Sequence, residues 1–271
     1  MTRAELINEI KTKKTFLCVG LDPDIDKIPA HLNEEDDTIF EFCRLIIDAT
    51  AEHCIAYKPN TAFFEAYGLT GLSSLEKTIK YIKHNYPKHF LIADAKRGDI
   101  GNTSRMYAKA FFNRLHADAI TVAPYMGKDS VTPFLEFDNK WAIVLALTSN
   151  EGSADFQMLT TNGKELYKEV LKATSAWGTD ENLMYVVGAT KAEMLSEVRE
   201  IVPTHFLLVP GVGAQGGSIA DVCKYGLIKN DIGLIINMSR SVIYASNGED
   251  FAEAAANEAK KVSLELSAYV K

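Results

Sequence analysis

Charged side chains suited to acid–base chemistry follow an apolar run near the middle of the chain. Residues 90–93 have the pattern of a buried strand, and Asp94, Lys96 and Asp99 come shortly after them. Because side chains alternate along a strand, Asp94 and Lys96 point to one side, and Gly98 then ends the strand and turns Asp99 in another direction. An acid and a base at the carboxyl end of a strand are typical of α/β active sites, although a solvated ion pair beside a turn gives the same pattern.

Short apolar segments alternate with amphipathic ones along the whole chain. The pattern predicts eight strand–helix units in 271 residues, about one unit per 34 residues, which is close to the length of a βαβ module. We therefore expect a single (β/α)8 barrel domain over residues 1–271, with a short helix over 2–12 covering one end. An open, doubly wound sheet of eight strands is the alternative. The predicted strands are 15–21, 55–60, 90–97, 119–122, 141–147, 183–187, 206–209 and 233–236, and one continuous helix is predicted over 101–115.

Several predicted strands end in polar residues, which a barrel would gather around one mouth. The first strand ends at Asp22 and the second at Lys58 and Asn60. Three later strands end in the segments 148–150 (TSN), 210–213 (PGVG) and 237–240 (NMSR). Neighbouring second and third strands would bring Lys58 beside Asp94 and Lys96. Opposite charges at this range keep each other ionised, so a lysine in such an array is a ready proton donor. A buried ion-pair network that only stabilises the barrel is the alternative.

A glycine-rich segment late in the chain favours an anion site. Gly211 and Gly216 flank a loop after the seventh strand, which lets the backbone approach a ligand closely, and phosphate sites in barrels commonly follow strands seven and eight. Arg240 can clamp phosphate oxygens and Gln215 can donate a hydrogen bond from the loop. The spacing is not that of a dinucleotide fingerprint, and a plain glycine turn remains the alternative.

The composition restricts the classes of function. A net charge of −7 argues against a general nucleic-acid binder, and the four cysteines form no C-x-x-C pair that would suggest a zinc site. Neither an apolar signal segment nor an apolar run of membrane-spanning length is present, so we expect a soluble, cytoplasmic protein. The polar stretch 148–161 is longer than a barrel loop requires; a lid over the substrate and a flexible insertion both fit it.

Taken together, these segments resemble the orotidine 5'-phosphate decarboxylase family, in its longer bacterial subfamily. The pattern D-x-K-x-x-D alone is shared with related sugar-phosphate barrels, whereas residues 94–103 and the loop 210–217 are far more specific. The resemblance rests on residues 19–24 (VGLDPD), 58–60 (KPN), 94–103 (DAKRGDIGNT), 123–130 (APYMGKDS), 148–150 (TSN), 187–190 (VGAT), 210–217 (PGVGAQGG) and 239–241 (SRS). The sequence differs from the family pattern at Glu151, where proline is usual, and at 237–238 (NM).

The resemblance implies a homodimeric barrel that converts orotidine 5'-monophosphate to UMP and CO2 without a metal or a cofactor. It implies that Lys96 protonates C6, that Asp94 lies beside the departing carboxylate, and that Lys58 links this array to the ribose. The implied substrate contacts come from Asp22 to a ribose hydroxyl, Ser149 to the pyrimidine, Gln215 and Arg240 to the phosphate, and Asp99 and Thr103 to the site of the partner subunit.

Two other functions remain open at this point. A related barrel enzyme, such as a hexulose-phosphate synthase or a keto-gluconate-phosphate decarboxylase, would need Mg²⁺ to stabilise an enediolate. A catalytically inactive nucleotide-binding protein is the second alternative, although the presence of all four residues Lys58, Asp94, Lys96 and Asp99 argues against it.

Overall fold

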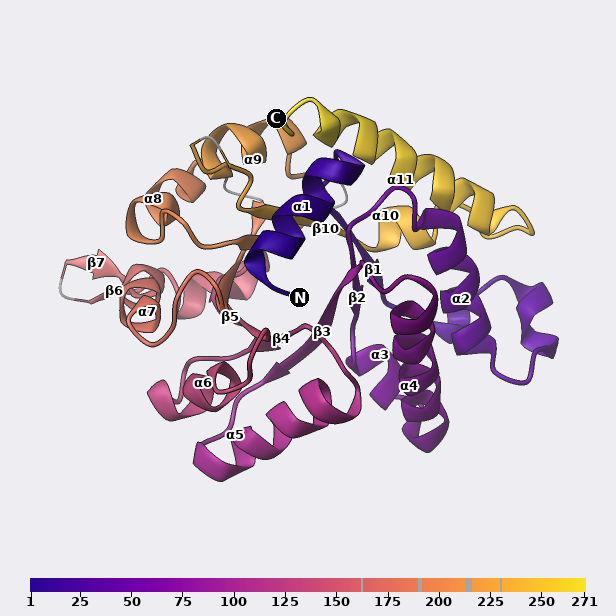
Figure 1. Ribbon diagram of the computed structural model, residues 1–271, viewed down its shortest axis with the longest axis horizontal. Helices are drawn as coiled ribbons and strands as arrows, with labels where there is room; N and C mark the ends of the chain where they lie inside the picture. Colours follow the sequence, from indigo (N-terminus) through magenta and orange to yellow (C-terminus); the bar gives the residue numbers. More distant parts are fainter. Residues whose placement is uncertain (162, 190–191, 213–215, 230) are drawn as a thin grey trace.

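Eight parallel strands close into a barrel in the computed structural model, which describes residues 1–161, 163–189, 192–212, 216–229 and 231–271. The strand order around the barrel is β1-β10-β9-β8-β5-β4-β3-β2 (Figure 1). The (β/α)8 prediction is therefore confirmed and the open sheet is excluded. The barrel strands are β1 (Leu17–Leu21), β2 (Ala56–Pro59), β3 (Phe90–Arg97), β4 (Ala119–Val122), β5 (Trp141–Leu147), β8 (Leu183–Val187), β9 (Leu207–Pro210) and β10 (Leu234–Met238).

Helices follow the strands and surround the barrel. The predicted helix over 101–115 is interrupted: α5 ends at Ala108, and the wider turn of a π-helix, η3 (Lys109–Arg114), continues it. The α-helices are α1 (Arg3–Lys13), α2 (Thr38–Thr50), α3 (Ala62–Glu65), α4 (Gly68–Asn85), α5 (Gly101–Ala108), α6 (Lys128–Leu135), α7 (Leu166–Ser175), α8 (Met194–Ile201), α9 (Ile219–Gly226), α10 (Arg240–Ile243) and α11 (Phe251–Ser267); the shorter 3-10 turns are η1 (Ile25–Lys27), η2 (Ala30–Glu34) and η4 (Glu151–Asp155).

The helix α2 illustrates how the sequence specifies this outer layer. Asp37 caps its first turn by accepting a hydrogen bond from the backbone N of Phe40 at 3.1 Å. Its apolar residues recur at the spacing of one helical face and are buried against the neighbouring layers, at Ile39, Phe42, Cys43, Ile46 and Ile47. The strands themselves are buried on both faces, so the core is continuous from the barrel interior to the helices.

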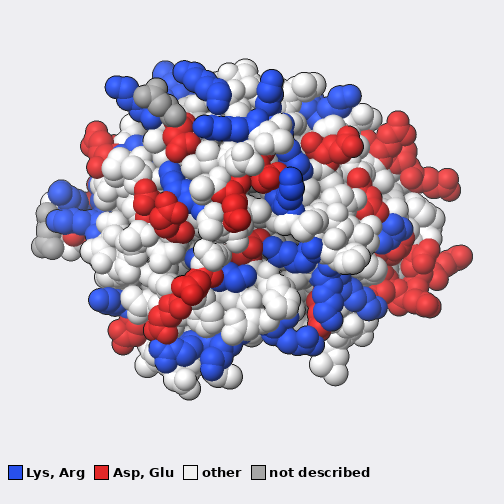
Figure 2. Space-filling view, viewed as in Figure 1, with Lys and Arg blue, Asp and Glu red and all other residues white. Residues whose placement is uncertain are grey.

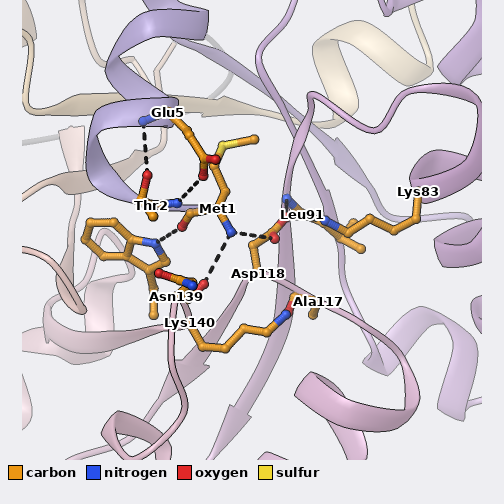
Figure 3. Close-up of polar contacts among 10 residues, drawn as sticks. Met1, Thr2, Glu5, Lys83, Leu91, Ala117, Asp118, Asn139 and Lys140 are labelled. Carbon is orange, nitrogen blue, oxygen red and sulfur yellow. Dashed lines mark hydrogen bonds and ion pairs between the residues drawn. The ribbon is translucent and has the colours of Figure 1, made fainter.

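The helix α1 crosses the end of the barrel at which the strands begin (Figure 1). Asp118, just before β4, accepts hydrogen bonds from the amino group of Met1 at 3.2 Å and from the backbone N of Leu91 at 2.9 Å, and it forms an ion pair with Lys83 (Figure 3). The indole of Trp141 donates to the carbonyl of Met1 at 2.9 Å. These contacts join the residue before α1 to the amino-terminal ends of β3, β4 and β5, so the polar mouth must lie at the opposite end.

The surface on the α1 side carries mixed charge. Figure 2 shows acidic and basic side chains interspersed over this face, with acidic ones gathered at the edge beside α2. Among the described residues, no helix is both long and apolar enough to cross a membrane.

The connection between β5 and α7 is one of the long connections of the barrel. Between β5 and α7 the chain forms η4 and then a small antiparallel hairpin of β6 (Thr160–Thr161) and β7 (Lys164–Glu165). The stretch predicted from sequence as a lid or an insertion thus has secondary structure of its own. It begins at the carboxyl end of β5, directly beside the polar mouth.

Candidate active site

One carboxylate, that of Asp94 on β3, carries a lysine on each oxygen. Lys58 on β2 donates from Nζ to Oδ2 at 2.8 Å, and Lys96 donates from Nζ to Oδ1 at 2.7 Å. Lys58 and Asp94 are buried, whereas the side chain of Lys96 is 53% exposed. Pairing of β2 with β3 therefore brings the three predicted residues together, with Lys96 as the more exposed of the two cations.

Strand β3 departs from regular pairing where it carries these charges. Residues 94–96 of β3 lie opposite the single residue Thr121 of β4. Regular pairs flank them, Ala93 with Ile120 and Arg97 with Val122. Lys96 adopts a left-handed φ of 44°, and its backbone N donates to Oγ1 of Thr121 at 2.9 Å. The same hydroxyl donates to Oδ1 of Asp94 at 2.9 Å. Bulges commonly redirect side chains next to active sites, and this one aims both Asp94 and Lys96 into the mouth.

The two buried charges hold each other ionised. Burial disfavours the charged form of Asp94, but the attraction of Lys58 and Lys96 outweighs it and holds the pKa of Asp94 well below its usual range. Burial likewise disfavours the charged form of Lys58, and attraction to Asp94 and then to Asp22 raises the pKa of Lys58 above its usual value. Both groups therefore stay charged at neutral pH.

Two adjoining cavities open at this end of the barrel, and Lys58 and Asp94 line both. The first, about 190 Å³, extends past Asp22 to Arg240 at the start of α10. The second, about 250 Å³, contains Lys96 and the segment 148–150 after β5. Small-molecule sites usually hold about 300–1,000 Å³, so the two together are of the size that one ligand needs. Such a ligand would have one end at Arg240 and the other at Lys96.

The predicted site residues are distributed unevenly over this cleft. Asp22 and Arg240 line the first cavity, and Ser149 lines the second. Asp99 and Thr103 line neither, because Asp99 turns away after β3 and Thr103 is exposed on α5. Gln215 lies outside the described residues.

Three polar residues to which the sequence assigned no role also line the cleft. Asn60 follows Lys58 at the end of β2, and Asn237 lies within β10 rather than after it. Thr121 is one polar residue in an otherwise apolar strand, which is why the sequence pattern alone did not single it out. The pairing of β3 with β4 is what brings its side chain beside Asp94 and Lys96.

Some polar atoms in the cleft lack a partner in the described part of the chain. These are Oδ1 of Asp22 and Oδ1 of Asn237, both buried. Buried acceptors of this kind carry an energetic cost unless a ligand or water donates to them. Across the described ranges, no group of three or more His, Cys, Asp or Glu side chains is arranged to hold a metal ion.

Comparison with known proteins identifies the family. The model of the orotidine 5'-phosphate decarboxylase / HUMPS family matches residues 15–255. The chain belongs to this family. The orotidine 5'-phosphate decarboxylase of Flavobacterium johnsoniae is 64% identical over 98% of this chain and 97% of its own length. That of Bacteroides fragilis is 57% identical over the whole of this chain and 99% of its own length.

Solved structures of the orotidine 5'-phosphate decarboxylase family show the same barrel. The OMP decarboxylase of Leishmania donovani is 37% identical and superposes with a TM-score of 0.81, covering 97% of this chain and 100% of that one. The family model includes enzymes of more than one reaction type, as its description indicates. The highly identical relatives are named as decarboxylases, which favours that branch over the sugar-phosphate branch.

Proposed function

We propose that this protein decarboxylates orotidine 5'-monophosphate to UMP, the last step of de novo pyrimidine nucleotide synthesis, without a metal or a cofactor. The observation that carries the proposal is the carboxylate of Asp94 held between Lys58 and Lys96 at the mouth of the barrel. Support also comes from relatives of 57–64% identity that bear the name of this enzyme.

The chemistry requires a fixed cation and a proton at one carbon atom. When the C6–carboxylate bond breaks, CO2 leaves and the electron pair remains on C6, where no ordinary electron sink is available. An ammonium group held nearby stabilises this charge, and preorganised charges of this kind supply much of the rate enhancement of enzymes. Lys96 then transfers a proton to C6 and regains one from solvent. Its two hydrogen-bond partners, Asp94 and the hydroxyl of Thr121 through the Lys96 backbone, orient it for this transfer.

The remaining cleft residues fit the distal parts of the substrate. Asp22 has a buried carboxylate oxygen without a partner among the described residues, which suits a ribose hydroxyl donor. Lys58 lines the same cavity as Asp22 and Asp94 and is attracted by both carboxylates, which suits a link between the ribose end and the reacting end. Arg240, at the far end of the cleft, suits the phosphate, together with Gln215 as the sequence pattern predicts. Binding energy at the phosphate can be used to position the ring against Lys96.

Assembly as a homodimer is part of the proposal. Asp99 and Thr103 line neither cavity of their own chain, and large exposed apolar side chains occur just before α5, on α5 and in the β4–α6 connection. These are Ile100, Met106, Tyr125 and Met126, of which Tyr125 is 90% exposed. Large exposed apolar side chains of this kind suit a protein interface. A second copy seated there would receive Asp99 and Thr103 at its own cleft.

The deciding experiment follows the loss of ultraviolet absorbance from orotidine 5'-monophosphate with EDTA present. We expect turnover by the wild-type protein and none by Lys96→Ala of equal thermal stability. A folded wild-type protein that binds UMP without turnover would instead be an inactive nucleotide-binding protein. Activity that appears only with Mg²⁺ and a sugar phosphate would assign the chain to the other branch of its family.

A further inference from the structure

The side chain of Gln157 holds Thr148, which lines the second cavity beside Ser149. Gln157 lies after η4, within the long β5–α7 connection. Its Oε1 accepts from the backbone N of Thr148 at 2.8 Å, and its Nε2 donates to Oγ1 of Thr148 at 2.9 Å. One amide thus satisfies both the backbone and the side chain of the first residue after β5, a two-point contact with fixed geometry.

The backbone of Gln157 is anchored at both sides. Its N donates to the carbonyl of Ser153 in η4 at 2.9 Å, and its carbonyl accepts from the N of Tyr167 in α7 at 3.0 Å. Tyr167 is fully buried in the core. Gln157 therefore connects the rigid start of α7 to the carboxyl end of β5, across the base of the long connection.

Ser149 is enclosed between the Gln157–Thr148 contact on one side and Gly188, after β8, on the other. Gly188, just after β8, approaches so closely that a Cβ atom there would lie 2.8 Å from the N, Cα and Cβ of Ser149. The N of Gly188 donates to the carbonyl of Leu147 at 2.8 Å. Ser149 is thus supported from β8 on one side and through Thr148 by Gln157 on the other.

The cleft geometry assigns Ser149 to the reacting end of the substrate. Ser149 lines the cavity that contains Lys96, whereas Arg240 lines only the other one. On the proposed function, decarboxylation at C6 puts the pyrimidine ring beside Lys96, and so beside Ser149, with the ribose phosphate directed toward Arg240.

We propose that Gln157 is a positioning residue for pyrimidine recognition: it fixes Thr148, and through it Ser149, at the edge of the ring. This inference rests on the proposed function and adds a residue to its site. Gln157 lines neither cavity of the cleft, so it acts through Thr148 rather than by contact with the substrate.

The test compares binding of UMP with binding of ribose 5-phosphate, which lacks the ring, by calorimetry. We expect Gln157→Ala to weaken UMP binding about tenfold and to leave ribose 5-phosphate binding unchanged, since the loss of a hydrogen bond of ordinary strength corresponds to roughly this factor. Gln157→Glu keeps the acceptor for the N of Thr148, and it should lose less. The control is Asp155→Ala, which removes an exposed carboxylate two residues away. Asp155 forms no hydrogen bond to Thr148 within the described residues, and this variant should behave like the wild type.

A double-mutant cycle separates positioning from general loosening of the connection. If Gln157 acts through Ser149, the combined variant Ser149→Ala with Gln157→Ala weakens UMP binding by less than the product of the two single effects. Equal losses for UMP and ribose 5-phosphate, or an unaffected UMP affinity in a folded Gln157→Ala protein, would overturn the inference alone. A wild-type protein that neither binds UMP nor turns over orotidine 5'-monophosphate would overturn the proposed function as well.

Discussion

The hydroxyl of Thr121 donates to Oδ1 of Asp94 at 2.9 Å, the same oxygen that accepts from Lys96 at 2.7 Å. The oxygen of this hydroxyl also accepts the backbone N–H of Lys96. One small side chain on β4 therefore fixes both members of the ion pair on β3. It fills the place of the ladder hydrogen bonds that the β3 bulge removes.

Replacing Thr121 by valine, which has nearly the same shape, removes both hydrogen bonds. We expect kcat to fall at least about tenfold, with a smaller change in KM, because Lys96 loses its orientation while the distal contacts remain. Steady-state kinetics measure this split. Thr121→Ser keeps the hydroxyl and should retain most of the activity; equal losses in the two variants would contradict a role for the hydroxyl.

The two lysines on Asp94 should differ in what they contribute to stability. Lys58→Met leaves the buried carboxylate of Asp94 paired only with the half-exposed Lys96. We expect the free energy of unfolding to fall by about 3 kcal/mol. Lys96→Met removes a half-exposed cation and should cost no more than about 1 kcal/mol. Urea denaturation measures both changes. Equal losses of stability in the two variants would contradict the distinction between a buried and a half-exposed ion pair. The proposed mechanism is tested separately, because it predicts that both variants lose turnover.

Acid should destabilise the fold through His89. Burial, followed by the charge of Lys13, lowers the pKa of His89 to about 4, against about 6.5 in an unfolded chain. Between these values the unfolded state binds a proton that the folded state does not, so stability decreases as the pH falls from about 6.5 to about 4. His89→Gln should therefore lose about 2 kcal/mol less than the wild type between pH 7 and pH 5.

Urea denaturation at the two pH values measures this difference. Burial also lowers the pKa of His205, so His205 contributes to the same loss of stability. The contribution of His89 is therefore taken as the difference in pH dependence between the wild type and His89→Gln. Asp94 contributes at lower pH, because its stabilisation is present above the unfolded pKa of about 3.9 and is lost below it. Parallel pH dependences of the two proteins would show that His89 is not the titrating group.

Asp118 should stabilise the end of the barrel that is remote from the cleft. Asp118→Asn removes a buried charge that pairs with Lys83 and with the amino group of Met1 (Figure 3), and we expect the free energy of unfolding to fall by about 3 kcal/mol. The control is Asp138→Asn, an exposed residue nearby, which should change it by less than about 0.5 kcal/mol. At saturating substrate, kcat should stay at the wild-type value in both.

Shared active sites can be tested by mixing two inactive proteins. Suppose that Asp99 enters the partner's cleft and that a dimer forms from one Lys96→Ala and one Asp99→Ala subunit. The cleft of the Asp99→Ala subunit then keeps its own Lys96 and receives an intact Asp99 from its partner, so one of the two sites is complete. Random exchange of subunits should then restore about a quarter of wild-type activity. Denaturation and joint refolding of equal amounts of both variants, followed by the absorbance assay, measures the recovery. No recovery in a mixture shown to contain hybrid dimers would place Asp99 in its own subunit's site.

Much of this structure follows from local sequence patterns. The strands β4, β5 and β8 have the predicted bounds. Each is a short apolar run between turn residues, which is the pattern of a strand buried on both faces of a parallel sheet. The proximity of Lys58, Asp94 and Lys96 was likewise predictable, since it needs only strand alternation and the pairing of consecutive strands.

The tertiary structure alone decided how those charges are held. Thr121 and Gln157 meet their partners across 27 and 9 residues of chain, through a bulge and a long connection whose geometry no local periodicity encodes. The π-helix at η3 is a comparable case, because the sequence pattern of an α-helix continues through it. Side-chain alternation and hydrophobic period are properties of neighbouring residues, and so the sequence determined the barrel and its charged strand ends. Hydrogen bonds between distant residues depend on the register and close packing of the closed barrel, and so only the folded chain determined the orientation of Lys96 and Ser149.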